Sequence, residues 1–299
     1  MTVSNASTIR RVSTLRLAPI HPDAADWSTR VVAQGASVST ATLAKVSRLC
    51  YAIDAAGIRD RFLRLNVFSG TGLNAAITPL FRGRSLTGAQ FGGAVDTNAG
   101  GASAFVSGDY SESVGLTAGL STSKHLDTGF TTSLVTAAQW EGLHLSAWHG
   151  PTGAGETDPY LLGVNNGGTD RFALQVSIRT TVASTDSARC GKTTNVLSTG
   201  WTNGARPAAF LLAQRAATTL LEFYRNGSIN ATNTTATTGI ASVSFPFFVF
   251  RLNNSGSQLG DQPGMALRHY SIGLAMTSVQ VASFYSAMLA FNTSMGRTS

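Results

Sequence analysis

Short runs of alternating apolar and polar residues recur along the second half of the chain. In 143–148, Leu143, Leu145 and Ala147 fall on one face of an extended chain, while His144 and Ser146 fall on the other. Similar runs follow at regular intervals, separated by Gly and Asn: YLLGVNN, DRFALQVSI, AAFLLAQR, LLEFYR, SINATN, SFPFFVFRL and ALRHYSIGLA. Many short strands between turn residues predict an antiparallel β-sandwich.

The segment LEFYRNGSINATNTT contains the clearest turn signal of the chain. Two runs rich in β-branched and aromatic residues flank Asn226 and Gly227. Asn-Gly favours the positive φ angles of a two-residue hairpin turn, so this segment predicts a β-hairpin. It carries no evident catalytic group, and its polar face is expected to be solvated or packed on a neighbouring subunit.

Two segments follow a helical period instead. The first begins at a Ser39 or Thr40 cap and places apolar residues three and four apart, and Gly57 is expected to end it. The second spans 277–296, is capped by Thr277 or Ser278, and is expected to cover an edge or a face of the sheet. The apolar positions of the second helix are Val281, Phe284, Tyr285, Met288, Phe291 and Met295.

These patterns divide the chain into three parts. Residues 1–38 carry Pro19, Pro22 and scattered basic side chains without sustained periodicity, so we expect an extended basic N-terminal arm that a partner orders. Residues 39–64 form the helical segment. Residues 65–299 form the β-sandwich together with the C-terminal helix.

The charge of the chain is concentrated near its N-terminus. Charged residues make up 12% of the 299 residues, and the net charge is +7. Residues 1–84 hold eleven Lys and Arg against four Asp, so the whole surplus lies there and the remainder is neutral. A neutral body gives no electrostatic reason to bind nucleic acid, and the basic segment favours docking on another protein. No apolar run reaches the length of a membrane span, and the N-terminus lacks the apolar core of a signal peptide.

Several of these segments, taken in order, resemble a family of bacteriophage and prophage structural proteins that carry a concanavalin A-like (laminin G-like) β-sandwich. The resemblance covers about 40–296 and departs from the usual pattern in the Gly/Ala-rich stretch 92–104 and at His125. The segments that carry it are AAGIRDRFLRLNVFSGTGLNAAITPLFRG, FVSGDYSES, STSKHLDTGF, LEFYRNGS, SFPFFVFRLNN and YSIGLAMTSVQVASFYSAMLAF.

That resemblance implies a mainly β protein, a jelly roll of two antiparallel sheets, located in the virion after synthesis in the cytoplasm of a bacterial host. We expect a structural protein of the tail, fibre, baseplate or capsid surface that binds other virion proteins and itself. The arm would dock through basic residues pairing with an acidic partner and apolar residues filling its grooves. The residues expected at this assembly interface are Arg10, Arg11, Val12, Leu15, Arg16, Leu17 and Ile20.

A receptor-binding module for a host-surface glycan is the alternative, because sugar binding needs exposed aromatic rings with polar neighbours. Trp148, Tyr160 and Trp201 are the candidate contacts, and for Trp201 both surface contact and core packing remain open. A glycan hydrolase ranks third. Glu156 and Asp158 are a carboxylate pair, but flanking glycines and Pro159 indicate a loop and no third carboxylate follows, so we expect no enzyme.

Metal-ligating residues are sparse. His144 and His149 are five apart and would point to opposite faces of a strand, and the other three histidines are isolated in the sequence, so no transition-metal site is expected. The other three are His21, His125 and His269.

Calcium and a disulfide are both left open by the sequence. Loop oxygens of Asp96, Asn98 or Asp127 are of the kind that holds calcium. Cys50 falls in the helical segment and Cys190 in a polar loop, and two cysteines do not make a disulfide scaffold.

Overall fold

A computed structural model of the chain describes most of its 299 residues. The described ranges are 19–119, 123–153, 159–176, 184–193, 196–201, 206–236, 240–260 and 264–297.

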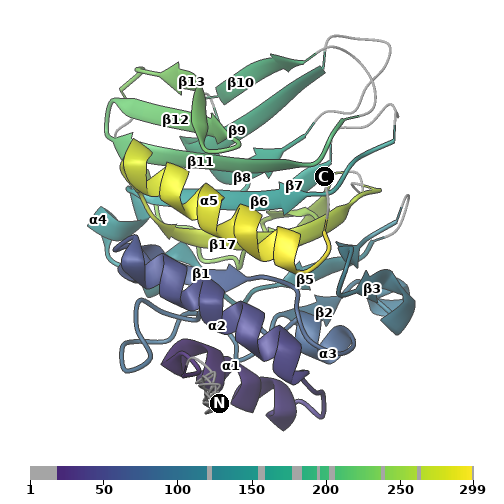
Figure 1. Ribbon diagram of the computed structural model, residues 1–299. Helices are drawn as coiled ribbons and strands as arrows, with labels where there is room; N and C mark the ends of the chain where they lie inside the picture. The colour runs from purple at the N-terminus through teal and green to yellow at the C-terminus, as the bar shows by residue number, and fades with distance from the viewer. Residues whose placement is uncertain are drawn as a thin grey trace, which may run out of the picture.

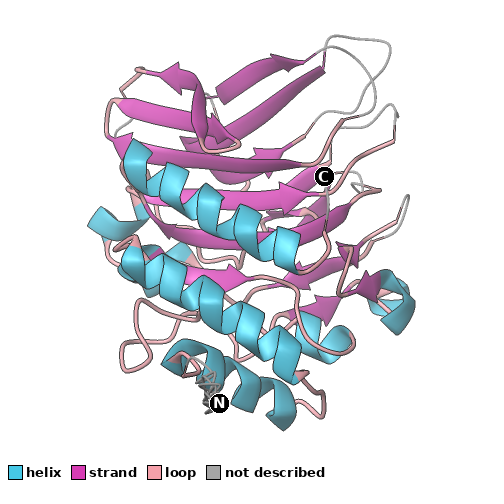
Figure 2. Ribbon diagram, in the orientation of Figure 1, coloured by secondary structure: helices cyan, strands magenta, loops and turns pink. Residues whose placement is uncertain are grey.

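Two β-sheets form the body of the protein (Figures 1 and 2). In the first sheet the strand order is β13-β12-β11-β6-β17-β4-β3, and β1 also pairs with β17. All its pairings are antiparallel. Its strands are β1 (Phe62–Asn66), β3 (Tyr110–Ser111), β4 (Gly115–Thr117), β6 (Leu143–His149), β11 (Ala209–Ala217), β12 (Leu220–Arg225), β13 (Ser228–Asn233) and β17 (Ala266–Leu274).

The second sheet has the order β10-β9-β8-β7-β14-β5-β2, and β15 pairs with β16 and β7. The short β15–β7 pairing is parallel and the others are antiparallel. Its strands are β2 (Thr97–Ala99), β5 (His125–Asp127), β7 (Tyr160–Asn165), β8 (Asp170–Gln175), β9 (Ser184–Lys192), β10 (Val196–Trp201), β14 (Phe248–Val249), β15 (Leu252–Asn254) and β16 (Ser257–Leu259).

Helices add a third layer on the outer side of the first sheet (Figure 1). The two longest, α2 and α5, lie side by side across the sheet, and α1 packs beside α2. The helices are α1 (Pro22–Ala33), α2 (Thr40–Ala55), α3 (Leu73–Ala76), α4 (Ala137–Trp140) and α5 (Ser278–Ser294), with short 3-10 turns at Arg59–Arg61, Gly101–Ser103, Ser107–Asp109 and Thr132–Leu134.

The first sheet is buried on both faces, so it borders two separate cores. Strand β6 shows the division, because Leu145 and Ala147 join the core between the sheets while Trp148 joins the core beneath the helices. Every residue of β6 is buried. Burying a large apolar side chain contributes about 1.5–3 kcal/mol, so both cores stabilise the same strands.

The two predicted helices are confirmed, and local sequence explains their ends. Ser39 caps α2 by accepting a hydrogen bond from the Thr42 backbone, and Gly57 follows the helix with φ +64°. Thr277 and Gln280 form a capping box at the start of α5. Caps of this kind contribute about 1 kcal/mol by satisfying backbone groups that the helix leaves open.

The Asn-Gly hairpin is also confirmed, and it contacts the helical layer. Asn226 and Gly227 have φ angles of 49° and 80° between β12 and β13. The Asn226 side chain accepts a hydrogen bond from the backbone of Phe210 on β11. A Cβ atom built on Gly227 would lie 2.8 Å from Cδ1 of Tyr285 on α5. The turn therefore packs against α5.

The N-terminal boundaries differ from the sequence prediction. An extended arm over 1–38 is wrong for Pro22–Ala33, which form α1 and bury Trp27 and Val31. The helical segment 39–64 ends in a strand, because β1 begins at Phe62 and pairs with the central strand β17. The sequence did carry a short helical signal here, because Pro22 stands at the start of the helix and Ala24, Trp27 and Val31 lie three and four residues apart.

The fold class is as the sequence predicts, a mainly β protein of two antiparallel sheets with a C-terminal helix. Within the described part of the chain, no helix is both long enough and apolar enough to cross a bilayer.

Candidate functional surfaces

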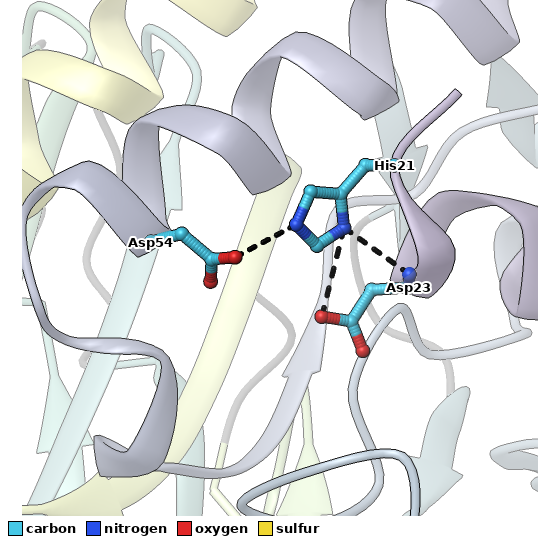
Figure 3. Close-up of side chains that lie close together, drawn as sticks. All are labelled: His21, Asp23 and Asp54. Carbon is cyan, nitrogen blue, oxygen red and sulfur yellow. Dashed lines mark hydrogen bonds and ion pairs between the residues drawn. The ribbon is translucent and has the colours of Figure 1, made fainter. Parts of the chain in front are cut away.

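His21 brings two carboxylates together at the start of α1 (Figure 3). Its Nδ1 accepts a hydrogen bond from the Asp23 backbone at 3.1 Å, and its Nε2 lies 2.8 Å from Asp54 Oδ2 on α2. Its backbone N–H donates to the Ser47 hydroxyl at 2.8 Å. Because Nδ1 accepts, the ring proton sits on Nε2 and is donated to Asp54. This histidine, isolated in the sequence, therefore joins α1 to α2.

Asp23 is occupied by a cation. Arg59 donates from Nε and from one terminal nitrogen to its two carboxylate oxygens at 2.8 and 2.9 Å. Among the described residues, His21, Asp23 and Asp54 are the set of three ligand-type side chains close enough for one metal ion. A metal would have to displace the helix cap and the Arg59 pair, so the arrangement fits a structural joint better than a metal site.

A row of polar side chains lies fully buried between the first sheet and the helices. His144 and Ser146 come from β6, and His269 and Ser271 from β17. The Ser146 hydroxyl lies 3.1 Å from His269 Nε2 and 2.6 Å from the Ser271 hydroxyl, which lies 2.9 Å from His144 Nε2. His144 Nδ1 lies 2.8 Å from the Leu274 carbonyl.

The carbonyl at one end sets the direction of the whole row. A carbonyl only accepts, so His144 Nδ1 carries the proton and its Nε2 accepts from Ser271. Ser271 then accepts from Ser146, and Ser146 accepts from His269. Desolvation by burial lowers the pKa of His144 to about 4 and that of His269 to about 3, so both rings are neutral at neutral pH.

The serines and histidines of this row are the residue types of a catalytic nucleophile and its base, but the resemblance ends there. All four side chains have zero exposure, and no carboxylate is among the hydrogen-bond partners of either histidine. A catalytic serine needs access to substrate and a base that can take its proton. The alternation along β6 predicted this face correctly, but the sequence does not show that the helices seal it.

Two of the three aromatic residues expected to contact glycan are buried. Trp148 is 4% exposed and stacks on Tyr285 of α5, with ring centroids 5.7 Å apart. Tyr160 is 8% exposed, and its ring lies close to Gly260. The prediction of surface contact is therefore wrong for both, because a helix and a loop cover them. The backbone of Trp201 ends β10, and its side chain lies outside the description, so its role stays a prediction.

The residues proposed for calcium are engaged within the protein. Asp96 is buried and accepts from Arg64, from Tyr270 and from the amide of Asn66. The Asn98 amide exchanges hydrogen bonds with the backbone of Phe105. These two side chains hold loops in place.

Asp127 is the third calcium candidate. One of its carboxylate oxygens accepts from the Gly129 backbone at 2.8 Å, and burial raises the pKa of the carboxyl. It therefore shapes the turn after β5.

Several predicted residues lie outside the described ranges. They are the interface residues Arg10, Arg11, Val12, Leu15, Arg16 and Leu17, and the carboxylates Glu156 and Asp158. Ile20 is described and is 39% exposed.

Both cysteines are free and buried, Cys50 beneath the helices and Cys190 between the sheets. The loop predicted around Cys190 is wrong, because Cys190 lies in β9, between β8 and β10. Desolvation raises the pKa of the Cys50 thiol well above its ordinary value and that of Cys190 to about 12. Neither thiol is therefore a nucleophile, and the open question of a disulfide is settled.

A shallow polar pocket of about 320 Å³ opens at the N-terminal end of α5. Arg61, Glu222, Ile229, Ser278 and Gln280 contribute to its lining. The Glu222 carboxylate accepts from Gln214 at 2.7 Å and from the Tyr224 hydroxyl at 2.8 Å. The pocket offers hydroxyl, amide and charged groups beside one exposed apolar residue.

A groove of a different character runs between α2 and α5. At one end Lys45 and Arg48 lie beside Phe291 and Ser294. The rest is lined by small, uncharged residues of both helices: Ala52, Ala55, Ala56, Val279, Ala282, Ser283, Ser286, Ala287 and Ala290.

No protein-family model matches the chain, and neither does any curated protein sequence. Solved structures give partial likenesses. One is a structure of botulinum neurotoxin type C, whose cell entry depends on interaction with two ganglioside molecules, at 10% identity and a TM-score of 0.39 over 55% of this chain and 39% of that one. This chain spans less than half of the length of the first structures that it matches.

Two further likenesses are to domains of bacterial proteins. The CBM40 of the Ruminococcus gnavus IT-sialidase, bound to α2,3 sialyllactose, is 12% identical with a TM-score of 0.39 over 56% of this chain and 95% of that one. Domain 4 of AbnA, a GH43 extracellular arabinanase of Geobacillus stearothermophilus in complex with arabinotriose, is 13% identical with a TM-score of 0.36, over 54% and 72%. Likenesses this partial say nothing of what this chain binds.

Proposed function

We propose that this chain is a structural protein of a bacteriophage particle, attached through its basic N-terminal end and displaying the β-sandwich. Support comes first from the series of sequence segments that resemble phage and prophage structural proteins in their order along the chain. These segments span nearly all of the described fold. The polar side chains with the chemistry of a catalytic or metal site, where described, are engaged inside the protein. Such a body suits assembly better than catalysis.

The proposed mode of attachment rests on the position of the first described residues, next to helix α2. The Tyr51 hydroxyl donates to the Pro19 carbonyl at 3.2 Å, so the chain joins the described structure beside α2. On the same helix Lys45 and Arg48 line the groove, and neither forms an ion pair with a described residue. The basic residues of 1–18 thus precede a surface that is itself basic. An acidic surface of another virion protein would complement the basic residues of 1–18.

The test is immunogold labelling of intact particles with an antibody against the sandwich. Label on the head supports a decoration protein, and label on the tail tip or fibres supports a host-contacting component. Particles that contain none of the protein overturn the proposal.

Reversing the charge of the N-terminal segment tests the mode of attachment. Changing Arg10, Arg11 and Arg16 together to Glu should abolish incorporation into particles, whereas changing all three to Lys, which keeps the charge, should preserve it. Equal incorporation of both variants would contradict attachment through charge. Circular dichroism of the purified variants confirms that both fold.

The second candidate is a module that binds a host-surface glycan, and the polar pocket beside α5 is the observation in its favour. Its volume of about 320 Å³ is near the lower end for small-ligand sites, and its lining supplies hydrogen-bonding groups. Ile229, at 50% exposure, forms its apolar side.

A glycan array with the purified protein tests this second role. Binding that Ile229→Arg abolishes would assign the pocket, and binding lost in Trp201→Ala would assign the end of β10. An array without signal, together with normal host adsorption by particles carrying Trp201→Ala, would leave the structural role alone.

A further inference from the structure

The outward face of α5 differs from that of an ordinary surface helix. Its 17 residues, SVQVASFYSAMLAFNTS, include no charged side chain. Val279 is 74% exposed and Leu289 is 42% exposed, and Ala282, Ser286 and Ala290 are exposed between them. A helix without a charged face is normally covered on all sides, so this face is expected to lie against another protein surface.

The residues that point outward repeat symmetrically about Ser286. Ala282 and Ala290 lie four residues on either side of it, and Val279 and Thr293 lie seven on either side. These spacings keep all five on one face of the helix. Along this row the side-chain sizes have the same order in either direction: β-branched, small, small, small, β-branched. Leu289 lies beside the row, and its mirror position holds the smaller Ser283.

We infer that this face is the interface of a homodimer, in which α5 packs antiparallel on α5 of a second copy across a two-fold axis near Ser286. Antiparallel packing would place Ala282 opposite Ala290 of the second copy, and Val279 opposite Thr293 of the second copy. A two-fold interface uses the same patch twice, so each residue would meet its mirror position, and Leu289 would lie opposite the smaller Ser283 of the second copy. Small residues let helices approach closely over the helix length of about 25 Å.

Charge selects the antiparallel arrangement over the parallel one. Helix α2 runs opposite to α5, since Lys45 and Arg48 lie beside residues 290–294, and Ala55 and Ala56 beside residues 279–283. Antiparallel packing therefore brings Lys45 and Arg48 toward the C-terminal end of α2 in the second copy. That end carries the negative pole of the helix and Asp54, and the last turn has no basic residue to repel them. Parallel packing would instead bring the two basic ends together.

Sedimentation velocity of the full chain over a wide concentration range tests the dimer directly. The wild-type chain should dimerise reversibly, and Ser286→Arg should weaken the dimer at least about tenfold, because it buries an unpaired charge at the centre. The matched control is Ser257→Arg on β16, also an exposed serine but away from the helices, which should leave the dimer unchanged. A monomer at every concentration, or equal association of Ser286→Arg and wild type, overturns the inference.

Cysteine cross-linking tests the geometry, and it remains informative if Ser286→Arg folds poorly. Ser286→Cys should oxidise to a disulfide-linked dimer, while Val279→Cys should cross-link only when mixed with Thr293→Cys. The buried Cys50 and Cys190 do not compete, since burial keeps their thiols protonated. Efficient self-linking of Val279→Cys would show parallel packing and overturn the arrangement. These outcomes do not depend on the role in a particle, which the labelling experiment tests separately.

Discussion

The two faces of the first sheet are equally buried but chemically different. On β6, Leu143 and Leu145 face the second sheet among apolar side chains, while His144 and Ser146 face the helices, and all four have zero exposure. Leu143 and Leu145 on the inner face contribute apolar burial alone. The outer face also depends on a directed row of hydrogen bonds between neutral groups. The stability of the helical layer should therefore depend on the protonation of these side chains and on their hydrogen-bond geometry. The stability of the sandwich core should depend on the volume of its apolar side chains.

Acid should produce the largest effect, and should act first on the helical layer. Burial lowers the pKa of His144 to about 4 and that of His269 to about 3, from 6.5 in an unfolded chain. Below about pH 6.5 the unfolded chain takes up protons that the folded chain does not. Stability is therefore full above that pH and falls as pH drops toward about 4, by up to about 1.4 kcal/mol per pH unit for each histidine.

Urea denaturation at a series of pH values measures this slope. His144→Gln, which keeps a polar side chain but does not titrate, should show a shallower fall than wild type. The tryptophans give a spatial readout, because Trp27 and Trp148 belong to the core beneath the helices and Trp140 to the core between the sheets. If the free energy of unfolding did not change between about pH 6.5 and pH 4, the burial of neutral histidine rings would be contradicted.

A cavity in the sandwich core should have the next largest effect. Leu145→Ala removes a fully buried side chain from the inner face of β6 and should lower the free energy of unfolding by about 2–5 kcal/mol. Chemical denaturation at neutral pH measures it. The loss should be the same at lower pH, relative to wild type, since no titrating group is touched. A loss below about 1 kcal/mol would indicate a core that collapses around the gap.

Breaking the polar row should cost somewhat less. Ser271→Ala leaves His144 Nε2 without its donor and the Ser146 hydroxyl without its acceptor, so we expect a loss of about 1–3 kcal/mol. Ser257→Ala on the exposed strand β16 is the matched change and should be close to neutral. Equal stabilities of the two variants would show that the row contributes nothing.

The hairpin turn gives the smallest of these effects. Gly227→Ala places a Cβ at positive φ, a strain of about 1–2 kcal/mol, and sets it 2.8 Å from the Tyr285 ring. Gly35→Ala is the control, because Gly35 has φ +71° but no atom lies within 4 Å of the added Cβ. Thermal melts should show a larger loss for Gly227→Ala, and the difference measures the contact with α5. Equal losses would mean that the ring moves aside freely.

Much of the fold could be predicted because its signals are local. The alternation in β6, the Asn-Gly turn and the caps of α2 and α5 each lie within a few residues of one another. Helix α1 was not predicted although Pro22 and the spacing of Trp27 and Val31 are local helix signals, and long-range contacts add to its order. The Trp27 indole donates to the Thr78 carbonyl, and Arg59 holds Asp23. Contacts over such separations leave no periodic pattern in the sequence.

The candidate sites were harder to predict, because a residue type does not reveal what covers it. Trp148 has the chemistry of a sugar platform, yet Tyr285 lies on its ring. His21 looked isolated, yet the packing of α1 on α2 brings Asp54 to its ring. In both cases the partner lies on another element.

The sequence by itself determined many of the strands, the hairpin, the two longer helices and the basic N-terminal end, because propensity, period and charge are properties of the chain. Only the tertiary structure decided which of those side chains remain accessible. Two sheets and a helical layer close over the histidines, over Ser146 and Ser271, and over most of the aromatic residues. They leave exposed an uncharged helix face whose significance appears only once its neighbour α2 is in place, because burial depends on what lies opposite a residue in space.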